Sequence, residues 1–531
     1  MGAFSRGIHC VFLAAILCWA ALCAQGAGLD FSPPAPLNQD ADTLEESSTA
    51  VKTDGKGHWV AAWTSGPAPN EETDILVSRS SNNGETWTDP VPLNNNAATD
   101  SALDGWVNLA TDCAGNWLAV WTSQAEGEDF DLLSARSTDN GATWTDPVPV
   151  TQNTGSELIH SLATDKNGVW MVVSETTDTL GDEIGPDQEL LVMRSTDNGA
   201  TWSPPRWLNT NAPTDNRNDY EPSIAVDVRG LWIVSWYADQ GDDFRIYIAR
   251  SSNAGVTWSS PSALNSTPLD YSEGASLLTA TDSKGHWVAA WNAINLSGNE
   301  VRILASRSTD GGQTWSAAKP INPNSANDSN FDYLMALATD EHGNWVAAWV
   351  SEDQLDDALE SDIEAAFSTD NGETWSQPVP IDTSDDSSNE DDYFPRLAAD
   401  GSGNWVCTWD SFSWDGGPFA SVYVARAFLP INTASLKVLV PNGGEKWKQG
   451  SKHALIWEPS AKGGAVRIEL RRNSGNPIVI HAATPDDGEF AWKVPKDITP
   501  GRGYKITVSA VNDAELTDQS DSDFRVKPKK P

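Results

Sequence analysis

Short runs of apolar, β-branched and aromatic residues follow one another along most of the chain, and none has the 3.6-residue period of a helix. Between residues 106 and 150 four such runs can be read, at 106–111, 117–123, 132–137 and 147–150. Gly, Asn and Asp separate them, as is typical of strands joined by tight turns. The pattern predicts a unit of four short strands.

The same unit recurs along the chain. A D-x-x-G-x-W turn precedes the second strand in seven places, and a nine-residue motif, RSTDNGATW at residues 136–144, follows the third strand in six. The six serines of this motif lie 56 to 60 residues apart. Such a regular period identifies a tandem array. The Asp and Gly of the first turn suit hairpin chemistry, because Asp can accept bonds from turn N–H groups and Gly can adopt positive φ.

The ends of the array predict how it closes. The last unit lacks a fourth strand, whereas residues 31–38 (FSPPAPLN) read like a fourth strand with no preceding three. A ring in which this N-terminal strand completes the last unit would leave no exposed sheet edges. The expected fold is therefore all-β, a seven-bladed β-propeller closed by an N-terminal strand.

The S-x-D-x-G-x-T-W core of the motif resembles the Asp-box, or BNR repeat, of the sialidase-like propellers, over about residues 30–430. The resemblance implies that the box lies on the turn between third and fourth strands, on the face away from the active site. The chemistry agrees, because the carboxylate can cap loop N–H groups, the Gly bends the chain and the Trp packs between sheets. The capping residues are Asp139, Asp197, Asp310 and Asp370, with Asn82 and Asn253 in the other two copies.

After residue 429 the repeat stops and basic residues become more frequent. Residues 436–526, with LKVLVPNGGEKWKQGSKHALIW at 436–457, are similar to the small β-sandwich of the fungal wall-glucan assembly (Kre9/Knh1-like) family. Strands between turn signals independently predict an immunoglobulin-like β-sandwich. The expected organisation is a signal peptide at 1–28, the propeller at 29–430, the sandwich at 431–526 and a basic tail at 527–531.

Residues 1–28 predict export, because Arg6 precedes an apolar run at 8–23 and small residues follow it. No later stretch is apolar enough to span a bilayer. Outside the signal only Cys113 and Cys407 remain, in units that are not neighbours, so no disulfide framework is expected. We expect a monomer that is secreted or held at the cell surface.

Charge is distributed unevenly. Residues 29–431 carry 17 basic and 63 acidic residues, a net charge of −46, whereas residues 432–531 carry 16 basic and 12 acidic residues, a net charge of +4. A domain with this net negative charge repels nucleic acid and attracts cations. Nucleic acid is therefore excluded as a partner of the propeller.

Carboxylates recur where the chain enters the innermost strand of six units. If the strands surround an axial channel, these acids ring its mouth and favour a cation, and outside the cell the expected cation is calcium. The competing interpretation is a strand cap that was repeated when the unit was duplicated. The acids are Glu46, Asp104, Glu157, Asp219, Asp332 and Asp392.

Aromatic residues accompany these acids. Neutral sugars are bound by aromatic faces beside hydrogen-bond acceptors, although the same residues can simply plug the channel. The candidate ligand-binding residues are Trp106, Tyr220, Tyr333, Tyr393 and Trp414.

The resemblance also implies a sialidase mechanism, in which three arginines hold the substrate carboxylate and a Tyr–Glu pair acts beside an Asp acid. The family's first arginine lies in an Arg-Ile-Pro motif near the first innermost strand, and residues 45–54 (EESSTAVKTD) contain no arginine. Adjacent Tyr220 and Glu221 point to opposite sides of a strand. The arginines left as candidates on the loop face are Arg217, Arg245, Arg302 and Arg396.

The sequence thus favours an exported, non-catalytic scaffold that binds a glycan or a protein through its loop face. The alternative is an exo-α-sialidase or another glycoside hydrolase acting at the same face, including one that uses paired acids of the ring.

Overall fold

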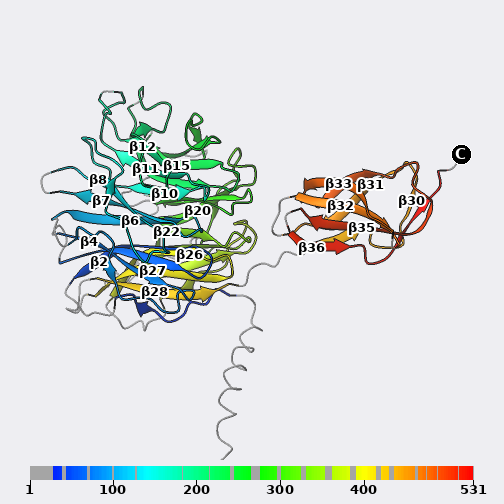
Figure 1. Cartoon of the computed structure of the whole chain (residues 1–531), viewed down its shortest axis with the longest axis horizontal. Coiled ribbons are helices and arrows are strands. Elements are labelled where there is room, and N and C mark those ends of the chain that lie inside the picture. The colour runs from blue at the N-terminus through cyan, green and yellow to red at the C-terminus, as the bar shows by residue number, and fades with distance from the viewer. Residues whose placement is uncertain are drawn as a thin grey trace, which may run out of the picture. The chain divides into compact units, whose positions relative to one another are not determined.

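A computed structural model describes residues 28–38, 44–67, 72–97, 101–125, 128–181, 183–214, 216–239, 244–264, 276–295, 300–323, 330–352, 361–382, 390–413, 420–429, 436–460, 465–473, 475–486, 488–511 and 513–529. The signal peptide expected at 1–28 lies outside these residues except for its last position, and so does Trp414. The chain divides into two compact units, whose boundary lies between Ile431 and Asn432. In both units the described residues form strands joined by turns and loops (Figure 1). No helix among them is long and apolar enough to cross a membrane.

Seven four-stranded antiparallel sheets make up the described part of the first unit. The innermost strands are β2 (Glu45–Thr53), β6 (Leu103–Thr111), β10 (His160–Thr164), β14 (Asp219–Val226), β18 (Leu277–Thr281), β22 (Phe331–Thr339) and β26 (Glu390–Ala399). The second strands are β3 (Trp59–Gly66), β7 (Trp117–Gln124), β11 (Trp170–Thr176), β15 (Trp232–Asp239), β19 (Trp287–Asn295), β23 (Trp345–Glu352) and β27 (Asn404–Ser413). The third strands are β4 (Asp74–Ser80), β8 (Asp131–Ser137), β12 (Glu189–Ser195), β16 (Phe244–Ser251), β20 (Glu300–Ser308), β24 (Ser361–Ser368) and β28 (Ser421–Phe428). The outer strands are β5 (Val91–Pro92), β9 (Val148–Pro149), β13 (Arg206–Trp207), β17 (Ser262–Ala263), β21 (Lys319–Pro320), β25 (Val379–Pro380) and β1 (Ala35–Pro36).

The sheets form a closed ring. Each innermost strand contacts that of the next sheet, and β26 of the last sheet contacts β2 of the first. The N-terminal strand β1 pairs with β28, with Ala35 opposite Val424, and the Leu37 N–H donates to the Val422 carbonyl at 2.9 Å. The predicted closure of the last sheet by the N-terminal strand is therefore confirmed.

The core of this unit lies between neighbouring sheets. One cluster joins Val60 and Ala62 of β3 to Leu109 of β6 and Trp117 of β7, and equivalent clusters follow around the ring. Six of the seven second strands carry two tryptophans four residues apart, and β11 carries one. These residues explain the arrangement, because a large flat side chain fills the space between two twisted sheets. Those of β3, for example, are fully buried.

Both repeated turns have the hydrogen bonds that their residue types predict. Asp112 accepts bonds from the N–H groups of Ala114 at 2.7 Å and Asn116 at 3.1 Å. In the box that follows, Asp139 accepts from the Thr143 N–H at 2.9 Å. The Asn140 N–H of this box donates to the Gly115 carbonyl. Both turns therefore lie at the same end of the sheet, and so on the same face of the ring. The Asp-box is therefore structural, and the opposite face carries the ends at which the chain enters the innermost strands.

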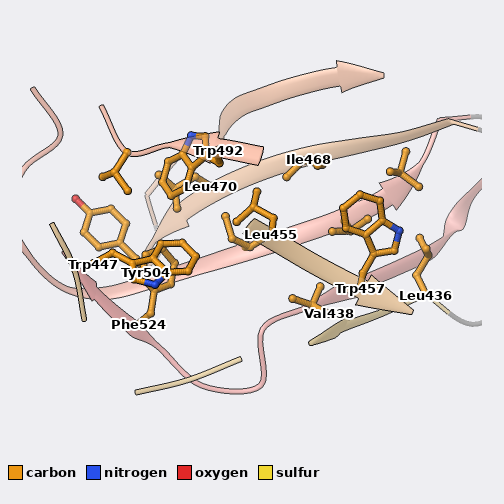
Figure 2. Packing of buried hydrophobic residues seen from close by; sticks show 14 of the residues in the cluster. Leu436, Val438, Trp447, Leu455, Trp457, Ile468, Leu470, Trp492, Tyr504 and Phe524 are labelled. Carbon is orange, nitrogen blue, oxygen red and sulfur yellow. The ribbon is translucent and has the colours of Figure 1, made fainter. Parts of the chain in front are cut away.

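The second unit is a β-sandwich of two sheets. One contains β29 (Lys437–Val440), β31 (Lys452–Glu458) and β34 (Glu489–Lys493); the other contains β30 (Lys446–Lys448), β37 (Phe524–Lys527), β35 (Gly501–Ala510), β32 (Ala465–Arg472) and β33 (Ile478–Pro485), with β36 (Asp513–Gln519) paired to β35. Figure 2 shows Trp447 with Tyr504 and Phe524 in one part of its core, and Trp457 with Val438 in another. The predicted immunoglobulin-like architecture is confirmed.

Candidate functional site

Five of the six predicted mouth acids lie within the first three residues of an innermost strand, and Glu157 lies three residues before β10. All six are buried, with at most 4 % of their surface exposed. They do not converge as a ring of free carboxylates. Each of four accepts a hydrogen bond from the amide of an asparagine that lies two residues after the outer strand of the preceding sheet: Asn38 to Glu46 at 2.7 Å, Asn94 to Asp104 at 3.0 Å, Asn209 to Asp219 at 2.8 Å and Asn322 to Asp332 at 2.8 Å. The acids therefore join consecutive sheets, which supports the interpretation as a repeated strand cap.

The other two acids have different hydrogen-bond partners. Glu157 accepts from Asn153 at 2.7 Å and from Thr176 at 2.8 Å, and burial raises its pKa to about 7. Asp392 hydrogen-bonds another carboxyl, that of Asp382, and burial together with this neighbour raises the pKa of Asp392 to about 8.

The calcium hypothesis gains no support from these positions. In the part of the chain that the structure describes, no three His, Cys, Asp or Glu residues lie together in a way that could hold a metal ion. The physical reason is that the carboxylates turn into the space between sheets, where amides satisfy them, rather than toward the axis.

Two residues after the acid, four innermost strands contain a residue in the left-handed region: Ser48 (φ 57°), Trp106 (φ 50°), Glu221 (φ 51°) and Phe394 (φ 53°). The strand register shifts at each of these places, so each is a β-bulge. Non-glycine residues in this region are strained by about 1–3 kcal/mol and concentrate at functional sites, where a bulge redirects a side chain. The bulges reorient Trp106 and Phe394 at the mouth.

Side chains of second strands hold the bulges in place. Asp410 of β27 accepts the Ser48 N–H at 2.7 Å, and Glu175 of β11 accepts the Glu221 N–H. Both carboxyls are buried, and burial raises each pKa to about 7. Sequence reasoning missed these two residues. The available signal was an acid five residues after the turn tryptophan, in a strand that is otherwise mostly apolar.

Trp106 lies at an open pocket between the first two sheets. Its surface is 52 % exposed, and its ring meets that of Phe130 edge-to-face at 6.2 Å. The pocket has a volume of about 190 Å³ and is also lined by Ser48 and the hydroxyl-bearing side chains of Thr64, Thr73 and Thr122. An aromatic face beside several hydroxyls suits a polar ligand with an apolar face.

The three predicted tyrosines are less exposed to solvent than Trp106. Tyr220, Tyr333 and Tyr393 are half-buried and pack against neighbouring phenylalanines, with ring centroids 5.6 to 6.4 Å apart. The Ser361 hydroxyl also donates to the Tyr393 oxygen at 3.0 Å. Phe394, which the sequence did not single out, is 40 % exposed. Trp106 and Phe394 are thus the exposed rings of the described mouth region.

The four candidate arginines occupy different structural positions. Arg245 of β16 and Arg302 of β20 are at equivalent places in adjacent sheets, opposite Ala238 and Ala293. Arg217 lies in the segment before β14 and lines a depression of about 290 Å³.

The fourth arginine, Arg396, is on the innermost strand β26, where its guanidinium donates to the carbonyls of Met335 and Pro395, each at 3.1 Å. Its charge also reaches the carboxyl of Glu221, on the opposite side of the ring. Burial, then the charge of Glu175, raises the pKa of Glu221 to about 8 despite this arginine. The raised pKa favours the protonated form of the Glu221 carboxyl, which can donate a hydrogen bond or a proton.

Family models match both units. A BNR repeat-like domain matches residues 57–297, and single BNR/Asp-box repeats match residues 306–317 and 366–377. A Kre9/KNH-like N-terminal Ig-like domain matches residues 440–526.

Curated relatives agree with these matches. A sialidase of Clostridium perfringens is 25 % identical over 265 residues, which are 45 % of this chain and 66 % of that protein, and a Bacteroides fragilis sialidase is 24 % identical over 48 % of its own length. The chain thus spans about half to two thirds of the curated relatives it matches. A structure of a Dyadobacter fermentans protein of unknown function aligns with a TM-score of 0.44 at 16 % identity, covering 76 % of this chain and 99 % of that one. The propeller thus contains BNR/Asp-box repeats, and a Kre9/KNH-like Ig-like domain follows it along the chain.

Proposed function

We propose that this protein is an exported, non-catalytic scaffold that binds a neutral glycan at the mouth of its propeller. The single observation that carries the proposal is Trp106, a large aromatic ring held open to solvent by a strained left-handed backbone at the edge of a hydroxyl-lined pocket. Solvent-exposed tryptophan costs solubility, and strain costs stability, so their coincidence favours a binding role.

The charge of the domain favours a neutral ligand over sialic acid. A net charge of −46 in residues 29–431 repels anions approaching from solution. The innermost strand β2 contains no arginine where sialidases carry their first substrate-binding arginine. The pocket beside Trp106 is lined by Ser and Thr hydroxyls, which suit the hydroxyl groups of a sugar.

Glycan binding can be measured directly. We expect the purified full chain to bind neutral oligosaccharides on a glycan array, and Trp106→Ala to weaken the best of them at least about tenfold, as the loss of a stacking ring predicts. Trp207→Ala, on the outer strand β13, serves as the matched control and should bind like the wild type. Wild-type binding to no neutral glycan, or equal binding by the Trp106 variant, would contradict the proposal.

The second candidate is a glycoside hydrolase that acts at the same face. It is favoured by Glu221, whose enclosed carboxyl keeps its proton at neutral pH as a general acid must. Turnover of fluorogenic sialosides and of neutral aryl glycosides distinguishes the two functions. Turnover that disappears in Glu221→Gln would replace the scaffold by an enzyme, whereas binding without turnover of any of these substrates supports the scaffold.

A further inference from the structure

An open pocket of about 380 Å³ lies between the fifth and sixth sheets, beside the outer strand of the fifth. Its lining includes Ala305 and Arg307 of β20, Lys319 of β21, and Glu373 and Trp375 of the Asp-box in the sixth sheet. We call it the rim pocket. Because the Asp-boxes lie on the face of the ring opposite the aromatic mouth, the rim pocket is separate from the glycan site proposed there.

A small side chain opens the rim pocket. The residue two positions before the arginine near the end of a third strand packs in one cluster with the box tryptophan of the next sheet, or bonds to it. Ala305 has the smallest side chain at this position, so it leaves space beside Trp375 that larger residues fill elsewhere. The residues at the six junctions are Val77, Ser134, Val192, Ile248, Ala305 and Val424.

The same space leaves the indole N–H of Trp375 open. The equivalent N–H of Trp202 donates to Ser134 at 3.0 Å. In the part of the chain that the structure describes, the Trp375 N–H has no hydrogen-bond partner, and it is not enclosed by protein. Four other box tryptophans have enclosed N–H groups: Trp87, Trp144, Trp258 and Trp315. Among the described box tryptophans, Trp375 alone therefore offers a ligand a donor on its ring.

Polar groups surround this ring. Glu373 pairs with Arg307, and the Lys319 Nζ lies 3.8 Å from the same carboxylate, so these contacts join the two sheets across the pocket. The Glu373 side chain is still 55 % exposed, and its carboxylate can accept further hydrogen bonds. The hydroxyls of Thr309 and Ser316 also line the pocket.

We infer that the rim pocket binds a neutral hexose residue, with an apolar face of the sugar on the Trp375 ring and sugar hydroxyls on Glu373 and Arg307. A pyranose has apolar C–H faces and several hydroxyls, which match one aromatic ring, an acceptor carboxylate and N–H donors. The volume falls within the range of about 300–1,000 Å³ that is typical of small-molecule sites. This site does not depend on the mouth, and two sites on opposite faces let one propeller hold two glycans at once.

The test uses the full chain carrying Trp106→Ala, in which the proposed mouth site is weakened, and the methyl glycosides of glucose, galactose and mannose as probes. We expect at least one probe to bind with a Kd on the order of 1 mM in saturation-transfer NMR titrations. Adding Ala305→Val should weaken this binding at least about tenfold, because the larger side chain fills the pocket. Three other sheets carry valine at this position, so the variant is compatible with the fold.

A second variant removes a polar contact without changing the volume of the pocket. Glu373→Gln should weaken binding about fivefold, because a carboxylate accepts hydrogen bonds more strongly than a neutral amide does. Glu85→Gln is the matched control and should bind like its parent. Glu85 has the equivalent place in the box of the first sheet, beside Val424 rather than an alanine.

No binding of any probe to the Trp106→Ala chain would overturn the inference, and so would binding that is unaffected by Ala305→Val or by Glu373→Gln. The two glycan sites fail separately in this test. Wild-type binding that disappears entirely with Trp106→Ala supports the mouth and overturns the rim pocket. Binding that depends on Ala305 and not on Trp106 supports the rim pocket and contradicts the mouth.

Discussion

At the scale of single residues, the repeat is held together by buried carboxylate–amide pairs. The amide of Asn94, for example, donates at 3.0 Å both to Asp104 of the next sheet and to Asp74 of its own. An amide suits this position because it donates two N–H bonds and carries no charge, so it satisfies acids without adding a second ion to a buried site. Two of the described junctions depart from the pattern. The junction before the third sheet has Thr151 at this position, whereas the junction before the last sheet is the exception that pairs two acids, because Asp382 stands where four other sheets have asparagine.

This exception predicts a pH dependence. Two carboxyls can hydrogen-bond only while they hold a proton, and the folded-state pKa of Asp392 is raised to about 8 from an ordinary value of 3.8. The stability it contributes is complete below about pH 4 and is lost as the pH rises toward 8. Asp382→Asn should therefore be more stable than the wild type at pH 8, by about 1–3 kcal/mol, and little different at pH 5.

Chemical denaturation at both pH values measures this difference. The reciprocal variant Asn322→Asp places an acid pair at another junction, and it should acquire the dependence that Asp382→Asn loses. Parallel pH profiles for the wild type and Asp382→Asn would show that the two carboxyls do not share a proton.

At the scale of the structural element, the Asp-box joins each sheet to the one before it. Its glycine adopts positive φ and comes so close to the preceding sheet that no Cβ fits: at Gly199 (φ 75°) an added Cβ would lie 2.4 Å from Leu118. The arginine at the end of the third strand also reaches the next box: Arg307 pairs with Glu373, and Arg426, whose sheet has no box of its own, lies 3.7 Å from Glu85. Conformation and packing therefore both require glycine in the box.

The two requirements can be separated. Gly199→Ala should destabilise the propeller by about 1–2 kcal/mol for the left-handed backbone and by about 1–3 kcal/mol more for the overlap with Leu118. Gly181 has nearly the same conformation (φ 72°), but its Cβ would meet nothing within 4 Å, so Gly181→Ala should show the backbone cost alone. Urea unfolding of the two variants measures the backbone cost and the packing cost. An equal loss of unfolding free energy in both variants would mean that packing at the box is loose.

At the scale of the whole molecule, stability depends on closing the ring. The first and last sheets share a core in which Leu37, from the segment that follows β1, packs with Val51 of β2 and with Val422 and Val424 of β28. Residues some 370 positions apart therefore form one cluster. Closure covers the edges that an open array of sheets would expose to other chains.

Weakening this closure should weaken the whole propeller. Leu37 is 4 % exposed, and we expect Leu37→Ala to cost about 2–4 kcal/mol and to promote aggregation, because it loosens the strand that seals the ring. Val91→Ala, in the outer strand of the first sheet, is the control, since Val91 is 52 % exposed. Calorimetry and light scattering measure the two effects. A Leu37 variant as stable as the Val91 variant would mean that β1 contributes little to closure.

The sequence alone determined the strands, the repeat, the closure by an N-terminal strand and the second β-sandwich. These follow from local periodicity and from turn chemistry, in which Asp112, Gly115 and Trp117 act within a few residues of one another. It also placed Trp106 at the mouth.

Only the tertiary structure decided what the mouth acids do and which aromatic rings are open. The direction of a side chain on an innermost strand depends on the bulge two residues beyond the acid, and that bulge is fixed by a neighbouring sheet, as Asp410 fixes Ser48. Likewise, the role of Glu175 depends on Glu221, which is distant in sequence and whose N–H it accepts. Local pattern therefore specified the scaffold, whereas contacts across the ring specified the chemistry of its centre.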